Sequence, residues 1–123
     1  PLLRERAART EDPEELGEII QALGRLGGNA DRELVLRHLE SANWVVRMKS
    51  AQALGTMGEP EDEERLLPLL SDRDWWVRLR AAEALARLPG MSLDRLRALR
   101  EGVSDRYGRD MLAQVIAEAE PAA

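Results

Sequence analysis

The sequence contains no cysteine and no phenylalanine, and aromatic residues make up only 3% of its 123 residues. The absence of cysteine excludes disulfide bonds and thiolate metal sites and fits a reducing compartment. With so few aromatic residues, leucine, alanine, valine and isoleucine must fill the interior. No apolar run approaches the roughly 18 residues of a membrane-spanning helix, and no signal peptide is visible. We therefore expect a cytoplasmic protein, or the soluble part of a membrane-anchored one, without direct membrane insertion.

The charge balance and the shortage of catalytic residue types argue against two classes of function, nucleic-acid binding and catalysis. Charged residues make up 33% of the chain, yet the net charge is −5. This balance argues against sequence-independent binding of nucleic acid, which needs clustered lysine and arginine. The single histidine, His38, stands alone, and the sequence has no nucleophile–base set, glycine-rich phosphate loop or metal-ligand cluster. We predict a protein that is not an enzyme and has no metal and no cofactor.

Glu59–Glu64 is the densest run of charge, with five carboxylates in six residues. The run lacks the ligand spacing of an EF-hand. Acidic residues gather at helix N-termini because the helix dipole favours negative charge there. We interpret the run as the start of a helix rather than as a cation site.

Asp74–Leu88 reads as one amphipathic helix. Asp74 is suited to cap its first turn, and Pro89 and Gly90 end it, since proline cannot continue a helix and glycine tolerates the turn. Within the stretch, apolar residues recur at helical spacing and form one stripe. These residues are Val77, Ala81, Ala84, Leu85 and Leu88.

Near copies of this helix recur at one constant interval along the chain. Asn43–Met57 aligns with Asp74–Leu88, and Asp105–Glu118 keeps the cap, an arginine and an apolar pair. Ala22–Gly27 matches the end of the second copy. Each copy follows another helical segment, and such pairs bury their apolar stripes only by stacking. We therefore predict an all-α solenoid of stacked antiparallel helix pairs in one domain, with repeats at 1–28 (partial), 29–59, 60–90 and 91–120.

The repeated pattern L-x-x-L-L-x-D-x-x-x-x-V-R-x-x-A-A-x-A-L-x-x-L resembles HEAT repeats, in the short bacterial form also found in phycobilisome lyases. The resemblance implies a right-handed stack whose inner helices line a concave, partner-binding surface. Deoxyhypusine hydroxylases are similar in architecture, but they need repeated His-Glu pairs, which this chain lacks. The acidic balance argues against a resemblance to the HEAT-like DNA glycosylases. The pattern stands here as Leu66, Leu69-Leu70, Asp72, Val77-Arg78, Ala81-Ala82, Ala84-Leu85 and Leu88.

Once the core positions of the inner helices are subtracted, a second face remains that mixes apolar, aromatic and charged side chains. Tryptophan, tyrosine and arginine are enriched among the residues that dominate protein interfaces, and exposed apolar patches mark recognition sites. We predict that this face binds a protein or peptide partner. Its predicted residues are Val45, Met48, Lys49, Gln52, Trp76, Leu79, Arg80, Glu83, Tyr107 and Met111.

The other two tryptophans share one register. Trp44 and Trp75 occupy the same position in successive copies of the helix, which suits a repeated structural task. We therefore expect each to pack on the neighbouring repeat, whereas Trp76 is expected to be exposed.

Three arginines also recur at one register, four residues after each predicted helix cap: Arg47, Arg78 and Arg109. We predict that each binds loop carbonyls or a carboxylate between repeats, as a structural ladder.

The resulting prediction of function is a non-catalytic interaction or scaffold module. Two alternatives stay open: an accessory subunit of an enzyme complex with a lyase-like role toward a chromophore, and a purely architectural or regulatory domain. Because the chain begins at Pro1 with a short first helix, we also expect it to be part of a longer protein. Another part of that protein, or a partner, is expected to cover Leu2, Leu3, Ile19 and Ile20.

Overall fold

The computed structural model describes residues 2–26 and 28–120, and within these residues the regular secondary structure is entirely helical. The all-α prediction is therefore confirmed. The described part contains eight α-helices and two short 3-10 helices, η1 and η2. In chain order they are α1 (Leu2–Arg9), α2 (Pro13–Leu26), α3 (Asn29–His38), α4 (Trp44–Met57), η1 (Pro60–Asp62), α5 (Glu63–Leu66), η2 (Leu67–Ser71), α6 (Trp75–Arg87), α7 (Leu93–Gly102) and α8 (Arg106–Ala119).

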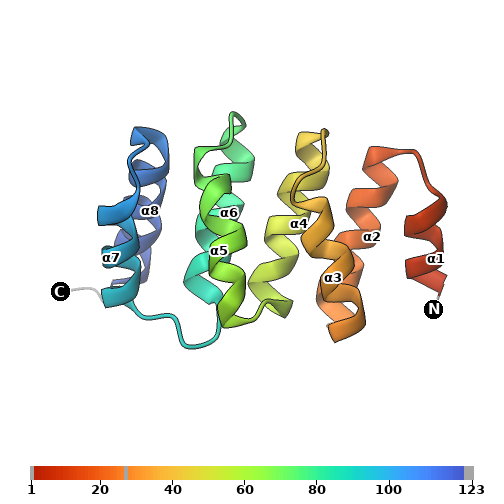
Figure 1. Cartoon of the computed structure of the whole chain (residues 1–123), viewed down its shortest axis with the longest axis horizontal. Helices are drawn as coiled ribbons and strands as arrows, with labels where there is room; N and C mark the ends of the chain where they lie inside the picture. Colours follow the sequence, from red (N-terminus) through yellow and green to blue (C-terminus); the bar gives the residue numbers. More distant parts are fainter. Residues whose placement is uncertain (1, 27, 121–123) are drawn as a thin grey trace.

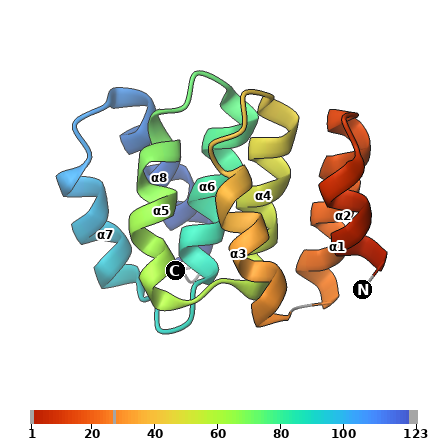
Figure 2. The same ribbon diagram turned by 45° about the vertical axis from the view of Figure 1, so that its right-hand side comes forward.

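The helices stand side by side in a row of antiparallel pairs, with α1 at one end and α7 and α8 at the other (Figure 1). Two layers are visible when the row is turned (Figure 2). One layer contains α3, α5 and α7, and the other contains α2, α4, α6 and α8. Neighbouring helices of the second layer pack directly on one another, so this layer presents one continuous exposed surface.

Short polar side chains start the helices of the second layer. Asn43 accepts a hydrogen bond from the backbone N–H of Val45 at 2.9 Å, and Asp74 accepts one from Trp76 at the same distance. Asp105 caps α8 in the same way. These caps satisfy backbone donors that have no partner inside the helix. Asp31, a residue type suited to cap a helix, does not cap α3, because this helix begins earlier, with Gly28 at its N-cap.

Pro68 shortens the outer helix of the third pair, as the presence of a proline within an apolar helical segment predicts. The α-helix α5 ends at Leu66, and the chain continues as the 3-10 helix η2 through Ser71. Proline has no N–H to donate and its ring crowds the preceding turn, so regular α-helical bonding cannot pass through it. The tighter 3-10 winding carries the chain onward to Asp72.

One apolar core runs between the two layers and is built almost wholly from aliphatic side chains. Ile20, Leu54 and Leu85 contribute to it from the second layer and are fully buried. The opposite layer supplies Val35, Leu66, Leu70, Leu96 and Leu99.

Small residues control how closely the helices of the second layer approach one another. A Cβ atom at Gly24 of α2 would lie 2.8 Å from the Cβ of Ala53 in α4, closer than real Cβ atoms come to other atoms. This glycine is therefore required by the contact between α2 and α4.

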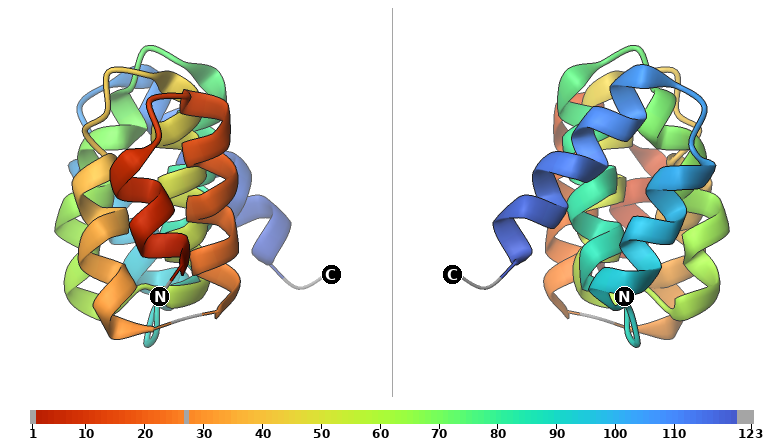
Figure 3. Two further views of the ribbon diagram at one scale, coloured as in Figure 1. Left: turned by 90° about the vertical axis from the view of Figure 1, so that its right-hand side faces the viewer. Right: turned by 90° about the vertical axis from the view of Figure 1, so that its left-hand side faces the viewer.

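The last interval of this layer lacks these small residues. The positions that correspond to Gly24 and Ala53 two repeats later hold Ala86 in α6 and Val115 in α8. These side chains are larger than Gly24 and Ala53, and α8 leans away from the common direction of α2, α4 and α6 (Figure 3).

We expect Gly24→Ala to lower the free energy of unfolding by about 1–3 kcal/mol, because the added methyl group overpacks the contact with Ala53. Urea denaturation followed by circular dichroism measures the change. Gly102→Ala is the matched control, since none of the described residues comes within 4 Å of a Cβ placed at Gly102. Equal unfolding midpoints for the two variants would contradict the close-contact explanation.

Candidate partner-binding face

The predicted binding residues come from three successive helices of the second layer. Val45, Met48, Lys49 and Gln52 lie on α4, and Trp76, Leu79, Arg80 and Glu83 lie on α6. All eight side chains are partly or fully accessible, and we call this surface the α4–α6 face. Tyr107 extends it onto α8 and is 61% exposed.

An aromatic cluster stands at one edge of the α4–α6 face. The rings of Trp75 and Trp76 meet edge to face, with centroids 4.9 Å apart and an interplanar angle of 86°. Both side chains are 45% exposed, and Trp44 is 40% exposed. Each is the first residue of its helix and keeps a large exposed area, so neither is fully buried between repeats. Their packing on the neighbouring repeats stays a prediction.

Two arginines hold aromatic rings of this surface in place. The guanidinium carbon of Arg80 lies 5.6 Å from the centre of the Trp76 ring, and that of Arg78 lies 5.1 Å from the centre of the Tyr107 ring. Cation–π contacts of this kind are worth about 0.5–1 kcal/mol at exposed sites. The rings are thus oriented before any partner arrives.

Met111 does not belong to the exposed surface. The sequence pattern predicts it as a binding residue, but it is 4% exposed and lies in the core beside Leu112. Its register matches that of Lys49 and Arg80, but on α8, which leans away from the other helices, this position is buried (Figure 3). An apolar side chain suits that buried position.

The expected covering of the first helices is also corrected in part. Ile19 and Ile20 need no cover from elsewhere, because the chain itself buries both of them. Leu3 is partly buried against the core, whereas Leu2 is exposed.

Arg47 lies deep between two helix pairs. It is 7% exposed, and its Nε and Nη2 atoms donate to the two carboxylate oxygens of Asp72 at 2.8 and 3.1 Å. Its Nη1 donates to the backbone carbonyls of Ser41 and Ala42. One guanidinium group thus joins the turn before α4 to the turn before α6.

The other two arginines of that register have different surroundings. Arg78 donates from Nη1 to the carbonyl oxygen of Asp72 at 2.7 Å, but its buried Nε has no hydrogen-bond partner among the described residues. The position corresponding to Asp72 in the next repeat holds Val103, whose side chain cannot accept a hydrogen bond. Arg109 is exposed, near Arg100. A shared register therefore does not give the three arginines a shared environment.

A second set of ion pairs, not predicted from the sequence, joins α3 to η1 and α5 to α7. Arg32 of α3 binds Asp62 through Nε and Nη2, at 3.0 and 2.7 Å, and the side chain of Asp62 also accepts the backbone N–H of Glu59. These contacts raise the pKa of Arg32 above its usual value, chiefly through the hydrogen bond to Asp62. Arg95 of α7 pairs with Glu63 in the same manner. The sequence separation within each pair is close to the repeat length, and this was the signal that could have revealed them.

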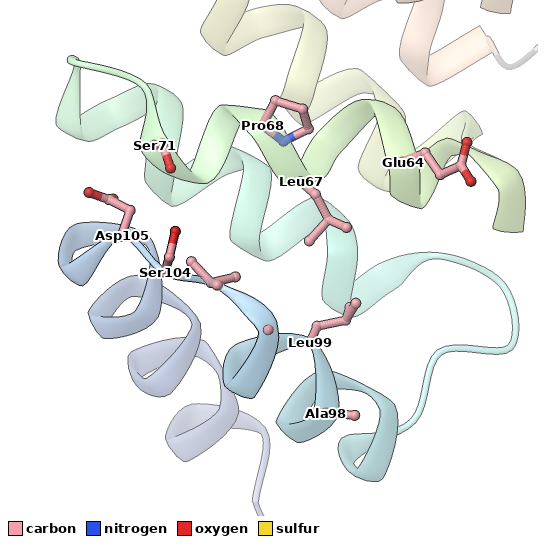
Figure 4. Close-up of a pocket in the computed structure, with 10 residues that line it drawn as sticks. Glu64, Leu67, Pro68, Ser71, Ala98, Leu99, Ser104 and Asp105 are labelled. Carbon is pink, nitrogen blue, oxygen red and sulfur yellow. The ribbon is translucent and has the colours of Figure 1, made fainter.

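Two polar grooves lie on the second layer and a larger cavity lies on the opposite one. The grooves have volumes of about 200 Å³ between α2 and α4 and about 90 Å³ between α4 and α6. The cavity, of about 490 Å³, lies between α5–η2 and α7 (Figure 4). Its walls are mainly Leu67, Pro68, Ala98, Leu99 and Val103, with Glu64 and Asp105 at its margins.

The described residues contain no group of three or more histidine, aspartate or glutamate side chains placed to hold a metal ion. None of the helices in the described part is long and apolar enough to cross a membrane. His38 is partly buried, and this burial lowers the pKa of its imidazole, with a smaller effect from the charge of Arg37.

We expect Arg47→Gln to lower the free energy of unfolding by about 3 kcal/mol, because it leaves the Asp72 carboxylate buried without its cation. Arg109→Gln is the matched control at the same register, and its exposure predicts a change within about 0.5 kcal/mol. Urea unfolding of both variants measures the difference. A loss of stability that is the same for both would show that the Arg47–Asp72 pair has no special role.

Comparison with known proteins agrees with this geometry. A search of curated proteins returned no match to the chain. The sequence model for HEAT repeats matches residues 33–117, about two thirds of the chain. This stretch contains the helices of the α4–α6 face and the Arg47–Asp72 pair. The chain belongs to the HEAT repeat family.

Proposed function

We propose that this protein is a non-catalytic interaction module that binds a protein or peptide through the α4–α6 face. HEAT repeats generally mediate protein–protein interaction. The observation that carries the choice of face is the exposed aromatic pair, Trp75 and Trp76, with Arg80 stacked on the Trp76 ring. Exposed apolar patches commonly mark recognition sites. Tryptophan and arginine are also enriched among the interface residues that dominate binding energy.

The face is also suited to binding because its aromatic rings are held in one orientation and because its composition resembles that of protein interfaces. Edge-to-face and cation–π contacts already orient the rings, so binding loses little side-chain entropy. Met48 and Leu79 are partly buried against the core and offer an apolar centre. Lys49 and Glu83 supply charge around that centre. An apolar centre with a polar rim is the usual composition of a protein interface.

The proposal includes an architecture. We propose that the helix pairs form one right-handed solenoid with a 31-residue period, with repeats at 1–28 (partial), 29–59, 60–90 and 91–120, inside a longer protein. The α4–α6 face is then its concave surface. Support comes from the caps at Asn43, Asp74 and Asp105, which are evenly spaced along the chain. Stacked repeats of this kind form extended binding surfaces.

The test is capture of partners from a bacterial lysate by the intact protein and by the double variant Trp76→Ala/Leu79→Ala. We expect a captured partner to be lost with the double variant, because the change removes an exposed aromatic ring and one apolar side chain of the face. Leu26→Ala removes an exposed apolar side chain on α2, outside the α4–α6 face, and should leave capture unchanged.

Circular dichroism must show equal helicity for all three proteins. Capture that is unaffected by the double variant would place the binding site elsewhere. If no partner is captured by any of the proteins, an architectural role explains the fold better. Uptake of a coloured ligand instead of a protein would support the lyase-like alternative.

A further inference from the structure

The two polar grooves of the second layer are built from corresponding residues of successive repeats. Gln21 and Gly24 line the groove between α2 and α4, and their counterparts one repeat later, Gln52 and Gly55, line the groove between α4 and α6. Ala53 and Ala84 form the corresponding small residues of the facing walls. The two grooves lie on either side of α4, and Gln52 is the one described lining residue that both have in common.

Gly55 keeps the second groove open, although helix packing does not demand a glycine there. A Cβ at Gly55 would lie 3.5 Å from the Cα of Ala84 and from the Cδ of Arg87, which is ordinary contact. Gly24, in contrast, cannot accept a Cβ beside Ala53. Glycine is the least favourable residue inside a helix apart from proline. Its presence in the middle of α4 thus weakens the helix and leaves space where the groove lies.

Charge around the grooves is predominantly positive. Arg25 lines the first groove, and Arg80 and Arg87 line the second, where Glu83 is the one carboxylate among the described lining residues. Glu83 accepts a hydrogen bond from Nη1 of Arg80 at 2.8 Å. The buried Nε of Arg80 has no hydrogen-bond partner within the described structure. Cationic donors are therefore in excess, which favours a ligand that carries carboxylates.

The dimensions of the second groove exclude a helical ligand. A helix with its side chains is roughly 10–12 Å across, too thick for a space of about 90 Å³. A stretch of extended main chain or one small side chain fits such a volume. The amide of Gln52 offers both a donor and an acceptor, the two groups that a peptide main chain requires.

We propose that the two grooves form one channel for an extended acidic peptide segment of the partner. The proposal rests on the function proposed above and specifies its ligand. The amide of Gln52 binds the main chain of the segment, and Arg25 and Arg87 bind its carboxylates at the two ends of the channel. The missing side chain at Gly55 admits the segment between α4 and α6.

The experiment is selection of a phage-displayed library of random linear dodecapeptides on the whole protein, followed by fluorescence anisotropy with the synthesised winners. We expect the selected peptides to be enriched in aspartate and glutamate relative to the input library. Gly55→Ala should weaken their binding about tenfold or more, since its methyl group fills the groove. The same change should raise Tm by about 3 °C, because alanine favours the helix.

Opposite effects on binding and stability separate loss of the channel from damage to the fold. Gly102→Ala, a glycine replacement in α7 with open space around it, should leave Kd unchanged. Arg25→Gln and Arg87→Gln should each weaken binding about tenfold, through loss of a charge-assisted contact.

Winners without acidic enrichment, or a Kd that Gly55→Ala leaves unchanged, would overturn the channel. The same holds if the library yields no binders. If such winners still lose binding with Trp76→Ala/Leu79→Ala, or if that double variant loses a captured protein, the proposed function stands without the channel. If neither peptide nor protein binding depends on the α4–α6 face, both proposals fail.

Discussion

The distance between neighbouring helices of the second layer is set by the small residues where they touch, and other features follow from it. Between α2 and α4 the contact of Gly24 with Ala53 leaves no room for another methyl group. Where alanine and valine occupy the corresponding positions, α8 leans away (Figure 3). On the leaning α8, Met111 is buried, whereas Tyr107 stays exposed beside the guanidinium of Arg78.

The buried Arg47–Asp72 pair adds a second constraint on how successive helix pairs stack. It acts between two turns rather than between two helix surfaces. Its hydrogen bonds tie two turns that are far apart in the sequence. A buried ion pair is no guarantee of net stability, because desolvation offsets much of the attraction. Its geometry does select one register between helix pairs. The loss of the acceptor at Val103 shows that the constraint is not repeated at the next interval.

The helical fold, the three caps of the second layer and the effect of Pro68 were predictable, because each depends on local sequence. The exposure of Trp44 and Trp75 was not, since a shared register gives the helix position of a residue but not the distance to its neighbour. Met111 was misplaced because the sequence pattern does not show that α8 leans away from the other helices. The partners of Asp62 were missed because the acidic run was interpreted through its own helix alone. The sequence patterns predicted the helices, but they did not predict the contacts between residues that are far apart in the chain.

The cavity between α5–η2 and α7 has a consequence for how the chain opens. The last helix pair is separated from its neighbour by this space on one side and by the lean of α8 on the other. Regions with few buried contacts unfold locally at lower free energy than the rest of a domain. We therefore expect the backbone amides of α7 and α8 to exchange with solvent deuterium sooner than those of α4. The resistance of the helix pairs to local unfolding is then highest in the middle of the row, where the α4–α6 face lies.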